Sequence, residues 1–326
     1  MVTQDDLLDG LVSYWKFDET SGTTASDSHG SNDGTVSGDT WVSGKINNCL
    51  SFDGSDDYVA MGDVLDDVIV GSSAKFTVSS WVKKSGDGMF ISKYADTQHG
   101  ENGRQLNMRF ASSQVELTYN GAISGTGGYE MYTTSNTYSN SVWYNIVFVV
   151  DMTQPLENRV IIYVDGVEQT TTVTTSGTPA GIQSGPAQFA VGGSVSSTGV
   201  LRYQINAIVD ETAIWNRALS SDEVKALYDI QKDGCESGSY PFDALIPRSI
   251  KGVVNLNSTN VEGAKVRLIN DTTDSYVGDT LTDVNGAYEF NVSSDTDDYH
   301  AMVEYESGGN KYHAVSYPFI KGGEDE

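Results

Sequence analysis

Three short stretches decide the fold of this chain: KFTVSSWVK (Lys75–Lys83), VWYNIVFVVD (Val142–Asp151) and RVIIYVD (Arg159–Asp165). Each is rich in β-branched and aromatic residues, and several of the stretches of this kind are apolar on both faces, as expected for the central strands of two packed sheets. The pair Asp165-Gly166 ends the third stretch and favours a two-residue hairpin turn, whose residues need a positive φ. We therefore expect many short antiparallel strands that form an all-β sandwich.

One helix interrupts this pattern. The tetrapeptide SSDE that starts at Ser220 predicts a capping box at the start of the helix. Val224, Leu227 and Tyr228 recur at helical spacing, and Gly234 can end the helix. We expect a short amphipathic helix that lies against a sheet edge.

The alternating pattern of the sequence stops after residue 234. Residues 235–249 carry two prolines and no periodicity, so they are predicted to be a linker between residues 1–234 and a second domain. Alternation resumes over residues 250–320, where about seven short strands predict a second, smaller β-sandwich. Residues 321–326 form an acidic tail.

Composition and charge exclude several classes of protein. The 326 residues are 38% hydrophobic, which is enough for a packed core. The formal net charge of −26 repels phosphate backbones and excludes nucleic-acid binding. No stretch reaches the roughly 18 apolar residues of a membrane span, so we expect no membrane insertion. The two cysteines, Cys49 and Cys235, could form one bridge but no disulfide framework.

The acidity itself has two explanations, which the sequence leaves open. One is adaptation to salty surroundings, where ions screen the repulsion between like charges. The other is a set of Asp-rich loops that hold Ca²⁺.

Several segments together resemble the laminin-G-like, concanavalin-A-like family of jelly rolls. Their order and spacing over more than 200 residues carry this resemblance, which implies a two-sheet jelly roll over residues 1–234. The segments are YWKFDETSG (Tyr14–Gly22), SDSHGSNDGTVSG (Ser26–Gly38), LSFDGSDDYVAMG (Leu50–Gly62), FTVSSWVKK (Phe76–Lys84), VWYNIVFVVD (Val142–Asp151), IIYVDGVEQ (Ile161–Gln169) and IVDETAIWNRALSSDEVKALY (Ile208–Tyr228). Four tryptophans stand at positions of this pattern and are expected in the core: Trp15, Trp81, Trp143 and Trp215.

The second region resembles carboxypeptidase-regulatory-like, or transthyretin-like, β-sandwiches. The resemblance rests on IKGVV (Ile250–Val254), VEGAKVRL (Val261–Leu268) and TDVNGAYEF (Thr282–Phe290). Its most characteristic feature is an Asn-Gly turn before an aromatic strand.

Catalysis is not expected. Glucanases with a concanavalin-like fold place two or three carboxylates on alternate residues of one strand, so that all face one cleft. The closest patterns here are Glu304 with Glu306, in the second domain, and Asp210-Glu211, whose adjacent side chains are expected on opposite faces. The four histidines show no metal-ligand spacing, and no Ser or Cys nucleophile motif is visible.

Calcium is the cofactor that the sequence favours. Ca²⁺ binds six to eight oxygen ligands from carboxylates, Asn and loop carbonyls. Asp27, Asn32 and Asp33 lie in a Gly-rich loop, and the resemblance implies that Asp210 returns beside the N-terminal strand. These four are the predicted metal ligands. The alternative is that they only form turns, as Asp and Asn do without a metal.

A candidate ligand surface lies within residues 118–141. This stretch places Tyr119, Tyr129, Tyr132 and Tyr138 among Gly, Asn and Ser. Aromatic faces stack on sugar C–H groups while small polar residues form hydrogen bonds, so these four tyrosines are the predicted glycan-binding residues. The alternative is a strand pair with tyrosines on its half-exposed face.

The expected function is that of a non-catalytic surface protein. The resembled families are displayed outside cells, but the N-terminus MVTQDDLLDGLVSYW lacks the basic and apolar regions of a secretory signal. A virion turret, fibre or decoration protein reconciles these observations, with a jelly roll that binds a glycan or host surface, other virion proteins as partners, and a homo-oligomeric state. The alternatives are a secreted carbohydrate-binding or adhesion protein, a glycan-processing enzyme, and a purely architectural protein.

Overall fold

The computed structural model describes residues 2 and 4–321, apart from residues 39, 96–103, 122–127, 178, 180, 233–247, 257–258, 271–274, 286, 293–297, 308–309 and 316–319. The chain forms two compact units, Met1–Gly234 and Cys235–Glu326. Most of the predicted linker at residues 235–249 lies outside the described residues, and so does residue 322 onward of the predicted tail. None of the described helices is long and apolar enough to cross a membrane.

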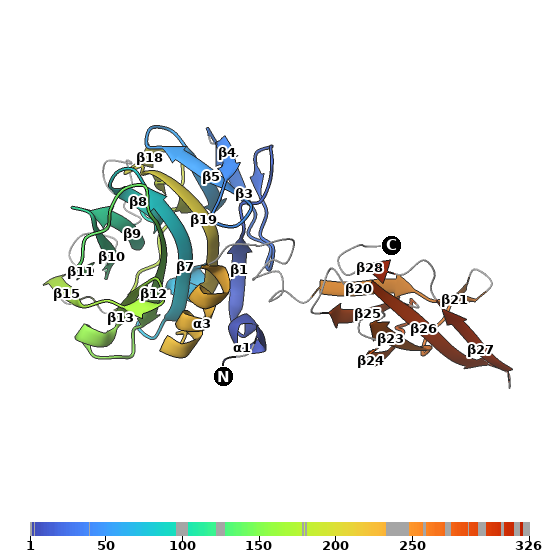
Figure 1. The fold of residues 1–326 in the computed structure, drawn as a ribbon. Coiled ribbons are helices and arrows are strands. Elements are labelled where there is room, and N and C mark those ends of the chain that lie inside the picture. Colours follow the sequence, from blue (N-terminus) through green and yellow to red (C-terminus); the bar gives the residue numbers. More distant parts are fainter. Residues whose placement is uncertain are drawn as a thin grey trace. The chain divides into compact units, whose positions relative to one another are not determined.

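The first unit consists of two large antiparallel sheets, which confirms the predicted all-β jelly-roll sandwich (Figure 1). The eight-stranded sheet has the order β14 (Val167–Glu168), β13 (Val160–Val164), β12 (Trp143–Asp151), β7 (Lys75–Lys84), β19 (Asn206–Trp215), β5 (Asn48–Asp53), β4 (Thr40–Ser43), with β1 (Leu11–Trp15) also paired to β19. The nine-stranded sheet has the order β15 (Thr171–Ser176), β11 (Tyr129–Thr134), β10 (Gln114–Asn120), β9 (Leu106–Ala111), β8 (Gly88–Lys93), β16 (Phe189–Val191), β6 (Tyr58–Gly62), β3 (Gly34–Ser37), β2 (Thr24–Ala25). Shorter elements are the hairpin β17 (Ser194–Val195) and β18 (Leu201–Arg202), the helices α1 (Gln4–Leu8), α2 (Asp66–Ile69) and α3 (Ser221–Gln231), and the 3₁₀ turn η2 (Leu156–Asn158).

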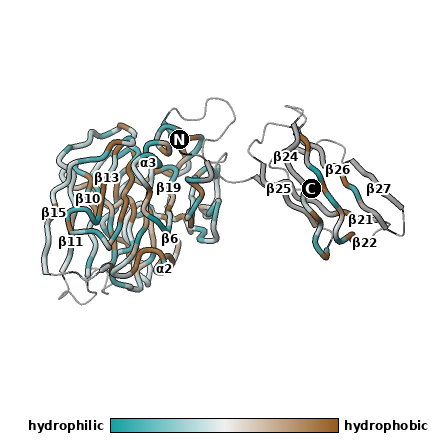
Figure 2. Tube along the Cα trace, turned by 90° about the horizontal axis from the view of Figure 1, so that it is seen from below, coloured by the Kyte–Doolittle hydropathy of each residue, from teal (hydrophilic) through white to brown (hydrophobic). Residues whose placement is uncertain are grey.

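The core lies between the two sheets. Aromatic rings from facing strands meet there: Trp15 stacks on Phe189 at 5.6 Å between ring centroids, and Phe90 stacks on Phe148 at 6.2 Å. Figure 2 shows hydrophobic residues along β13 and β19, two strands of the eight-stranded sheet. Each large side chain buried in this way contributes roughly 1.5–3 kcal/mol, so cross-sheet packing is the main source of stability.

The hairpin turn at residues 165–166 is as expected. Asp165 has φ 53° and Gly166 has φ 72°, and the turn joins β13 to β14. Positive φ at both positions is what a type I′ turn requires.

The capping box is also confirmed. The Ser220 hydroxyl accepts a hydrogen bond from the Glu223 N–H at 3.3 Å, and the Glu223 carboxylate accepts one from the Ser220 N–H at 2.7 Å. The helix covers the sheet face and not its edge, because Tyr228 of α3 stacks on Trp81 of β7, a central strand (Figure 1). The expected position at a sheet edge is therefore wrong.

Strand β19 contains a β-bulge that the sequence did not predict. Asp210 pairs with Trp81, but the next partners are Ala213 and Ser79, so β19 holds one extra residue here. Glu211 has the positive φ of 52°. The expectation that Asp210 and Glu211 point to opposite faces is wrong, because the bulge interrupts the alternation of the strand.

Three of the four tryptophans are core residues, as expected. Trp15, Trp81 and Trp215 are buried. Trp143 is only half-buried, at the start of β12, where the Lys83 ammonium lies 5.9 Å from its ring centroid. Cys49 is buried and forms no disulfide, and Cys235 lies outside the described residues.

The second unit also consists of strands. Three small antiparallel sheets are described, with nine strand segments where the sequence predicts about seven. They are β20 (Arg248–Val253) with β25 (Ala287–Val292); β21 (Asn255–Leu256) with β22 (Thr259–Asn260); and β24 (Ser275–Leu281), β23 (Lys265–Asn270), β26 (Asp298–Ser307) and β27 (Asn310–Val315), with β28 (Ile320–Lys321) paired to β26. The transthyretin-like resemblance of this unit stays a prediction.

Candidate functional site

A pocket of about 300 Å³ lies on the outer face of the nine-stranded sheet. This volume is at the lower end of the range for small-ligand sites. Its lining comes from four adjacent strands, β8 to β11, and from the loops that flank them: Met89, Tyr94, Arg104, Asn107, Arg109, Thr118, Asn120, Tyr129, Met131 and Tyr203.

Cross-strand register places the polar side chains of the pocket in rows. Thr118 on β10 lies opposite Asn107 on β9 and Met131 on β11, and Asn120 lies opposite Tyr129. Residues that pair directly across antiparallel strands point to the same face. Because side chains alternate between the two faces along each strand, the residues of this row point outward. The residues before and after them on the same strands point into the core.

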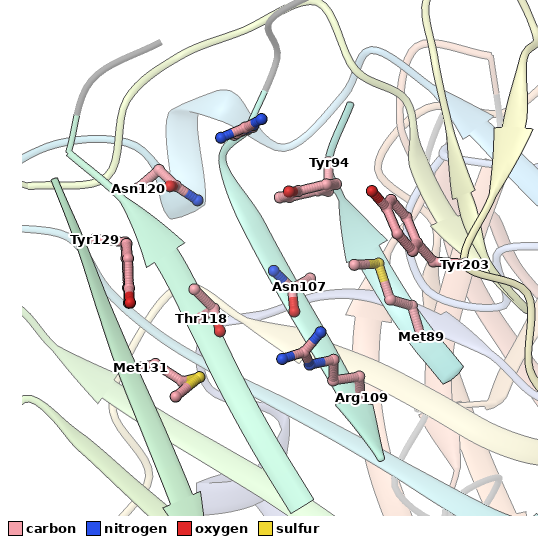
Figure 3. A pocket seen from close by; sticks show the side chains of 10 residues that line it. Met89, Tyr94, Asn107, Arg109, Thr118, Asn120, Tyr129, Met131 and Tyr203 are labelled. Atoms are coloured by element: carbon pink, nitrogen blue, oxygen red, sulfur yellow. The ribbon is translucent and has the colours of Figure 1, made fainter. Parts of the chain in front are cut away.

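Tyrosines stand on both sides of the pocket. Tyr94 and Tyr203 meet edge to face, with 5.9 Å between ring centroids, and Tyr129 stands on the opposite side (Figure 3). Tyr203 has the positive φ of 56°, and its carbonyl accepts a hydrogen bond from the Met89 N–H at 2.9 Å. This backbone contact fixes the tyrosine beside β8.

Asn107 lies between these tyrosines (Figure 3). The residue is 4% exposed, and its Oδ1 atom is buried without a hydrogen-bond partner. An unpaired buried amide oxygen costs roughly 1–3 kcal/mol, so a ligand hydroxyl that donates to Oδ1 would recover this energy.

Three of the four predicted glycan-binding tyrosines are in the core, so their assignment is wrong. Tyr119, Tyr132 and Tyr138 are buried, whereas Tyr129 lines the pocket. The physical reason is strand parity. Tyr119 shares the inward face of β10 with Leu117, and Tyr132 lies directly opposite Leu117 on β11.

The buried tyrosines have a structural role around one carboxylate. The hydroxyls of Tyr119 and Tyr132 both donate to Glu130, and the Arg159 guanidinium lies 2.7 Å from the same carboxylate. Burial, and then the negative charge of Glu130, raise the pKa of Tyr132 far above its usual value. The cluster holds β11 to the turn before β13 and leaves no aromatic face for a ligand.

Asp27 is the centre of a tight turn. Its carboxylate accepts four backbone hydrogen bonds, from the N–H groups of Tyr14, His29, Gly30 and Asn32, at 2.9–3.2 Å. Burial alone would raise the pKa of Asp27, but these hydrogen bonds outweigh it and lower the pKa. Backbone donors therefore already compensate this charge.

The other two loop candidates also have partners. Asp33 accepts a hydrogen bond from the Asp27 N–H at 2.8 Å. The Asn32 amide donates to the Ser13 hydroxyl at 2.8 Å, and the Asn32 carbonyl accepts from the Trp15 indole at 2.8 Å. These are the contacts of turn-forming residues, the alternative that the sequence leaves open.

Asp210 is buried in a different environment, beneath helix α3. Its Oδ2 atom accepts hydrogen bonds from the N–H groups of Lys45 and Ile46, at 2.8 and 3.0 Å, but its Oδ1 atom has no partner. Burial raises the pKa of Asp210 well above its usual value, and the nearby charge of Asp18 raises it further.

Glu211 lies beside Asp210 on the same outer side of the sheet. Its Oε2 atom accepts hydrogen bonds from the Tyr14 hydroxyl and from Gln231 of α3, which itself accepts one from the Trp81 indole. Its Oε1 atom is buried and has no partner. Burial, and then the charge of Asp210, raise the pKa of Glu211 well above its usual value.

The structure therefore does not bring the four predicted metal ligands together. Among the described residues, the one group of three carboxylates whose ligand atoms all lie within 4.8 Å is Asp53, Asp56 and Asp57. This group could hold a metal ion, but two of its members are exposed to solvent.

Comparison with known families and structures gives three findings. The sequence model of the concanavalin A-like lectin/glucanases superfamily matches residues 53–225, which is more than half of the chain. No curated protein sequence matches the chain. The binding domain of Paraclostridial Mosquitocidal Protein 1 has a similar fold, with 12% identity, a TM-score of 0.51, and coverage of 96% of this chain and 76% of that one.

Two further structures are similar over 67% of this chain. They are a Trypanosoma rangeli sialidase in complex with sialic acid (16% identity, TM-score 0.48) and domain 4 of the arabinanase AbnA from Geobacillus stearothermophilus in complex with arabinotriose (20% identity, TM-score 0.44). The match covers 98% of the arabinanase domain but only 32% of the sialidase chain.

Proposed function

This chain belongs to the concanavalin A-like lectin/glucanases superfamily, and from that premise we propose that it binds a saccharide in the pocket of its nine-stranded sheet without cleaving it. The observation that carries the proposal is Asn107, whose buried amide oxygen has no partner and which lies between tyrosines on both sides of the pocket. A saccharide hydroxyl is a hydrogen-bond donor of the kind that this oxygen needs.

The remaining lining suits the same ligand. The aromatic rings of Tyr94, Tyr129 and Tyr203 offer faces or edges for sugar C–H groups, while Thr118 and Asn120 offer polar groups for the hydroxyls. Sites of this kind combine apolar contact area with a few well-placed polar groups that fix orientation.

A non-catalytic role is part of the proposal. Hydrolysis of a glycosidic bond needs two carboxylates that flank it in an accessible cleft. The adjacent carboxylates of Asp210 and Glu211 lie on the other sheet, buried under α3, where no saccharide reaches them. No Asp or Glu is among the described residues that line the pocket.

For calcium, the proposal moves the site from the Asp27 loop to Asp210 and Glu211. These two residues hold buried carboxylate oxygens without a partner, whereas the Asp27 carboxylate accepts hydrogen bonds from four backbone N–H groups and one from the Ser13 side chain. A bound Ca²⁺ would neutralise two like charges that burial brings together, and its role would be structural.

The place of display is a further part of the proposal. We propose that the protein is displayed on the surface of a virus particle, where it forms a homo-oligomeric turret, fibre or decoration. A cellular adhesion protein is the alternative. Antibody labelling of purified particles tests this setting, and label confined to host cell surfaces would favour the alternative.

Binding itself is tested on a glycan array and then by calorimetry. The variant Asn107→Leu should bind a captured saccharide at least about tenfold more weakly, because one hydrogen bond to a buried group is worth about 1.4 kcal/mol. Asn136→Leu is the matched control, because Asn136 is exposed and donates to Gln169. Unchanged affinity in a folded Asn107→Leu variant would exclude this pocket.

Tyrosine variants separate the pocket from the core cluster. Tyr129→Ala should weaken binding about tenfold through lost stacking, with little effect on stability. Tyr119→Phe should instead lower stability, because it removes a hydroxyl that donates to Glu130, and should leave affinity unchanged. The reverse result would restore Tyr119 as a ligand residue.

A further inference from the structure

The pocket is closed on one side and open on the other. Its floor is a row of residues that pair directly across the nine-stranded sheet: Asn107 on β9, Thr118 on β10, Met131 on β11 and Thr174 on β15. Directly paired residues share one face of a sheet, so all four point outward. Asn107 is buried, Thr118 and Met131 are half-buried, and Thr174 is exposed. The row therefore leads from a closed end to the edge of the sheet.

Beyond Asn107, the same row continues under the hairpin of β17 and β18. Ser92 on β8 pairs with Asn107, and Ala190 on β16 pairs with Ser92, so both also point outward. Both are completely buried, although their side chains are small. The Ser92 hydroxyl donates to the Gly193 carbonyl at 2.9 Å, directly before β17. The hairpin therefore covers the outer face beside the pocket and forms a wall there.

Backbone hydrogen bonds hold this wall to the strands below it. The Gln188 N–H, next to β16, donates to the Val195 carbonyl at 3.1 Å. The Met89 N–H of β8 donates to the Tyr203 carbonyl at 2.9 Å. Tyr203 then stands beside Tyr94 at this side of the pocket (Figure 3). A wall that is fixed by its backbone does not yield when a single side chain changes its rotamer.

The opposite side gives a ligand a way out along the row. Tyr129 pairs with Asn120 in the neighbouring row, roughly 7 Å from Met131 along β11, so its ring flanks this path. From Asn107 to Thr174 the row crosses three strand spacings, about 14 Å in all. This length accommodates a short chain of sugars.

The unpaired amide oxygen lies at the closed end. Asn107 is the lining residue of the row that lies next to the wall, and its Oδ1 atom is buried without a partner. A hydroxyl that donates to Oδ1 therefore belongs to a sugar that has the wall directly beyond it. A further sugar on that side would overlap the hairpin.

We propose that the pocket binds the terminal sugar of a saccharide chain, and that the rest of the chain leaves over Met131 and Thr174 toward the edge of the sheet. This inference rests on the proposed function and gives its ligand a structural class: chain ends, and not internal segments of a polymer. The hairpin decides the class, because it stands where the next sugar of an internal segment would lie.

The test is an array of linear hexose and pentose oligosaccharides, tethered through the reducing end in one set and through the other end in a second set. Each appears with its terminal sugar free and with that sugar capped by benzyl ethers. The wild-type chain should retain the free form at least about tenfold more tightly than the capped form. Equal retention of both forms would overturn end binding but leave saccharide binding intact. Retention of neither form in either set would overturn the proposed function itself.

Shortening the hairpin tests the wall by a gain of binding. In a variant with residues 194–203 replaced by two glycines, capped chains should bind as tightly as free ones, because the obstruction is gone. Structural damage alone would lower both signals and would not equalise them. A variant that melts cooperatively and still rejects capped chains would overturn the role of the hairpin.

Two matched substitutions test the direction of the chain without a change in the backbone. Met89 lies at the walled side of the pocket and Met131 at the open side. Met89→Ala should weaken the binding of monosaccharides and of longer chains by the same factor. Met131→Ala should weaken chains of two or more sugars about tenfold and leave monosaccharides unchanged. Calorimetric titration of a length series measures both. The reverse pattern would overturn the proposed direction.

Discussion

The turn around Asp27 and the bulge at Asp210 and Glu211 compensate negative charge in opposite ways. The Asp27 carboxylate accepts four backbone hydrogen bonds. Asp210 and Glu211 are more deeply buried, yet each keeps one oxygen without a partner. The comparison teaches that the number of donors around a carboxylate decides whether a cation is needed, and the number of acidic residues in a loop does not.

The response to calcium should be the largest difference between the turn around Asp27 and the bulge at Asp210 and Glu211. If the ion binds the folded state alone, a hundredfold excess over its Kd stabilises by about 2.7 kcal/mol, and EDTA reverses this. Glu211→Gln should abolish the response, because it removes one of the two buried charges. The measurement is thermal unfolding with CaCl₂ against NaCl of equal ionic strength.

Asp53→Asn is the control for this experiment, because Asp53 belongs to the exposed acidic group. It should leave the calcium response intact. A response that Asp53→Asn removes and Glu211→Gln retains would place the ion at the surface. If neither wild type nor any variant responds to calcium, no ion binds at Asp210 and Glu211. The charge of this buried pair is then neutralised by a proton.

Asp27→Ala should give the second largest effect, a loss of about 2 kcal/mol in the free energy of unfolding. The substitution leaves four backbone N–H groups without their acceptor, although water reaches some of them. Asp33→Ala removes the acceptor of one N–H and should cost about 1 kcal/mol. Urea denaturation measures both, and equal costs would contradict the central role of Asp27.

The pH dependence of this cost follows from the lowered pKa of Asp27. A carboxyl group whose pKa is lower in the folded state stabilises the protein above its unfolded pKa, and this stability is lost as the pH falls through the folded value. The difference between wild type and Asp27→Ala should therefore shrink between about pH 6 and about pH 2. A constant difference over this range would mean that the charge of Asp27 plays no part.

Much of the fold follows from local sequence, and less of the site does. The turn at Asp165 and the capping box at Ser220 depend on neighbouring residues, so both are predictable. The inward position of Tyr119 is also predictable from the sequence. Tyr119 lies an even number of residues from Val115 and Leu117, two apolar residues of the same strand, and therefore shares their face.

The rest of the site depends on contacts between distant segments. Tyr94, Asn107 and Tyr203 meet only because β8, β9 and the segment after β18 are adjacent in space. The bulge at Glu211 interrupts a regular strand without a Gly or Pro to mark it. Strand pairing and bulges of this kind are properties of the folded sheet, which no short window of sequence contains.

The smallest expected effect is the response of the melting temperature to NaCl. It tests whether the difference between the Asp27 turn and the Glu211 bulge comes from specific sites or from the overall charge. The net charge of −26 destabilises the compact state through self-repulsion, and raising NaCl from about 0.01 M to about 1 M shortens the Debye length from about 30 Å to about 3 Å. The melting temperature should therefore rise with NaCl, and by the same amount in wild type, Asp27→Ala and Glu211→Gln, because each substitution removes only one of 45 acidic groups. The buried oxygens of Glu211 are shielded from mobile ions and should not respond to NaCl. The hydrogen bonds of Asp27 are direct contacts at 2.9–3.2 Å, a range at which screening by NaCl is weak. A flat or falling melting temperature would show that self-repulsion is unimportant here. A response that Glu211→Gln alone changes would mean that Na⁺ enters the buried site, and the distinction between general screening and a specific cation would then fail.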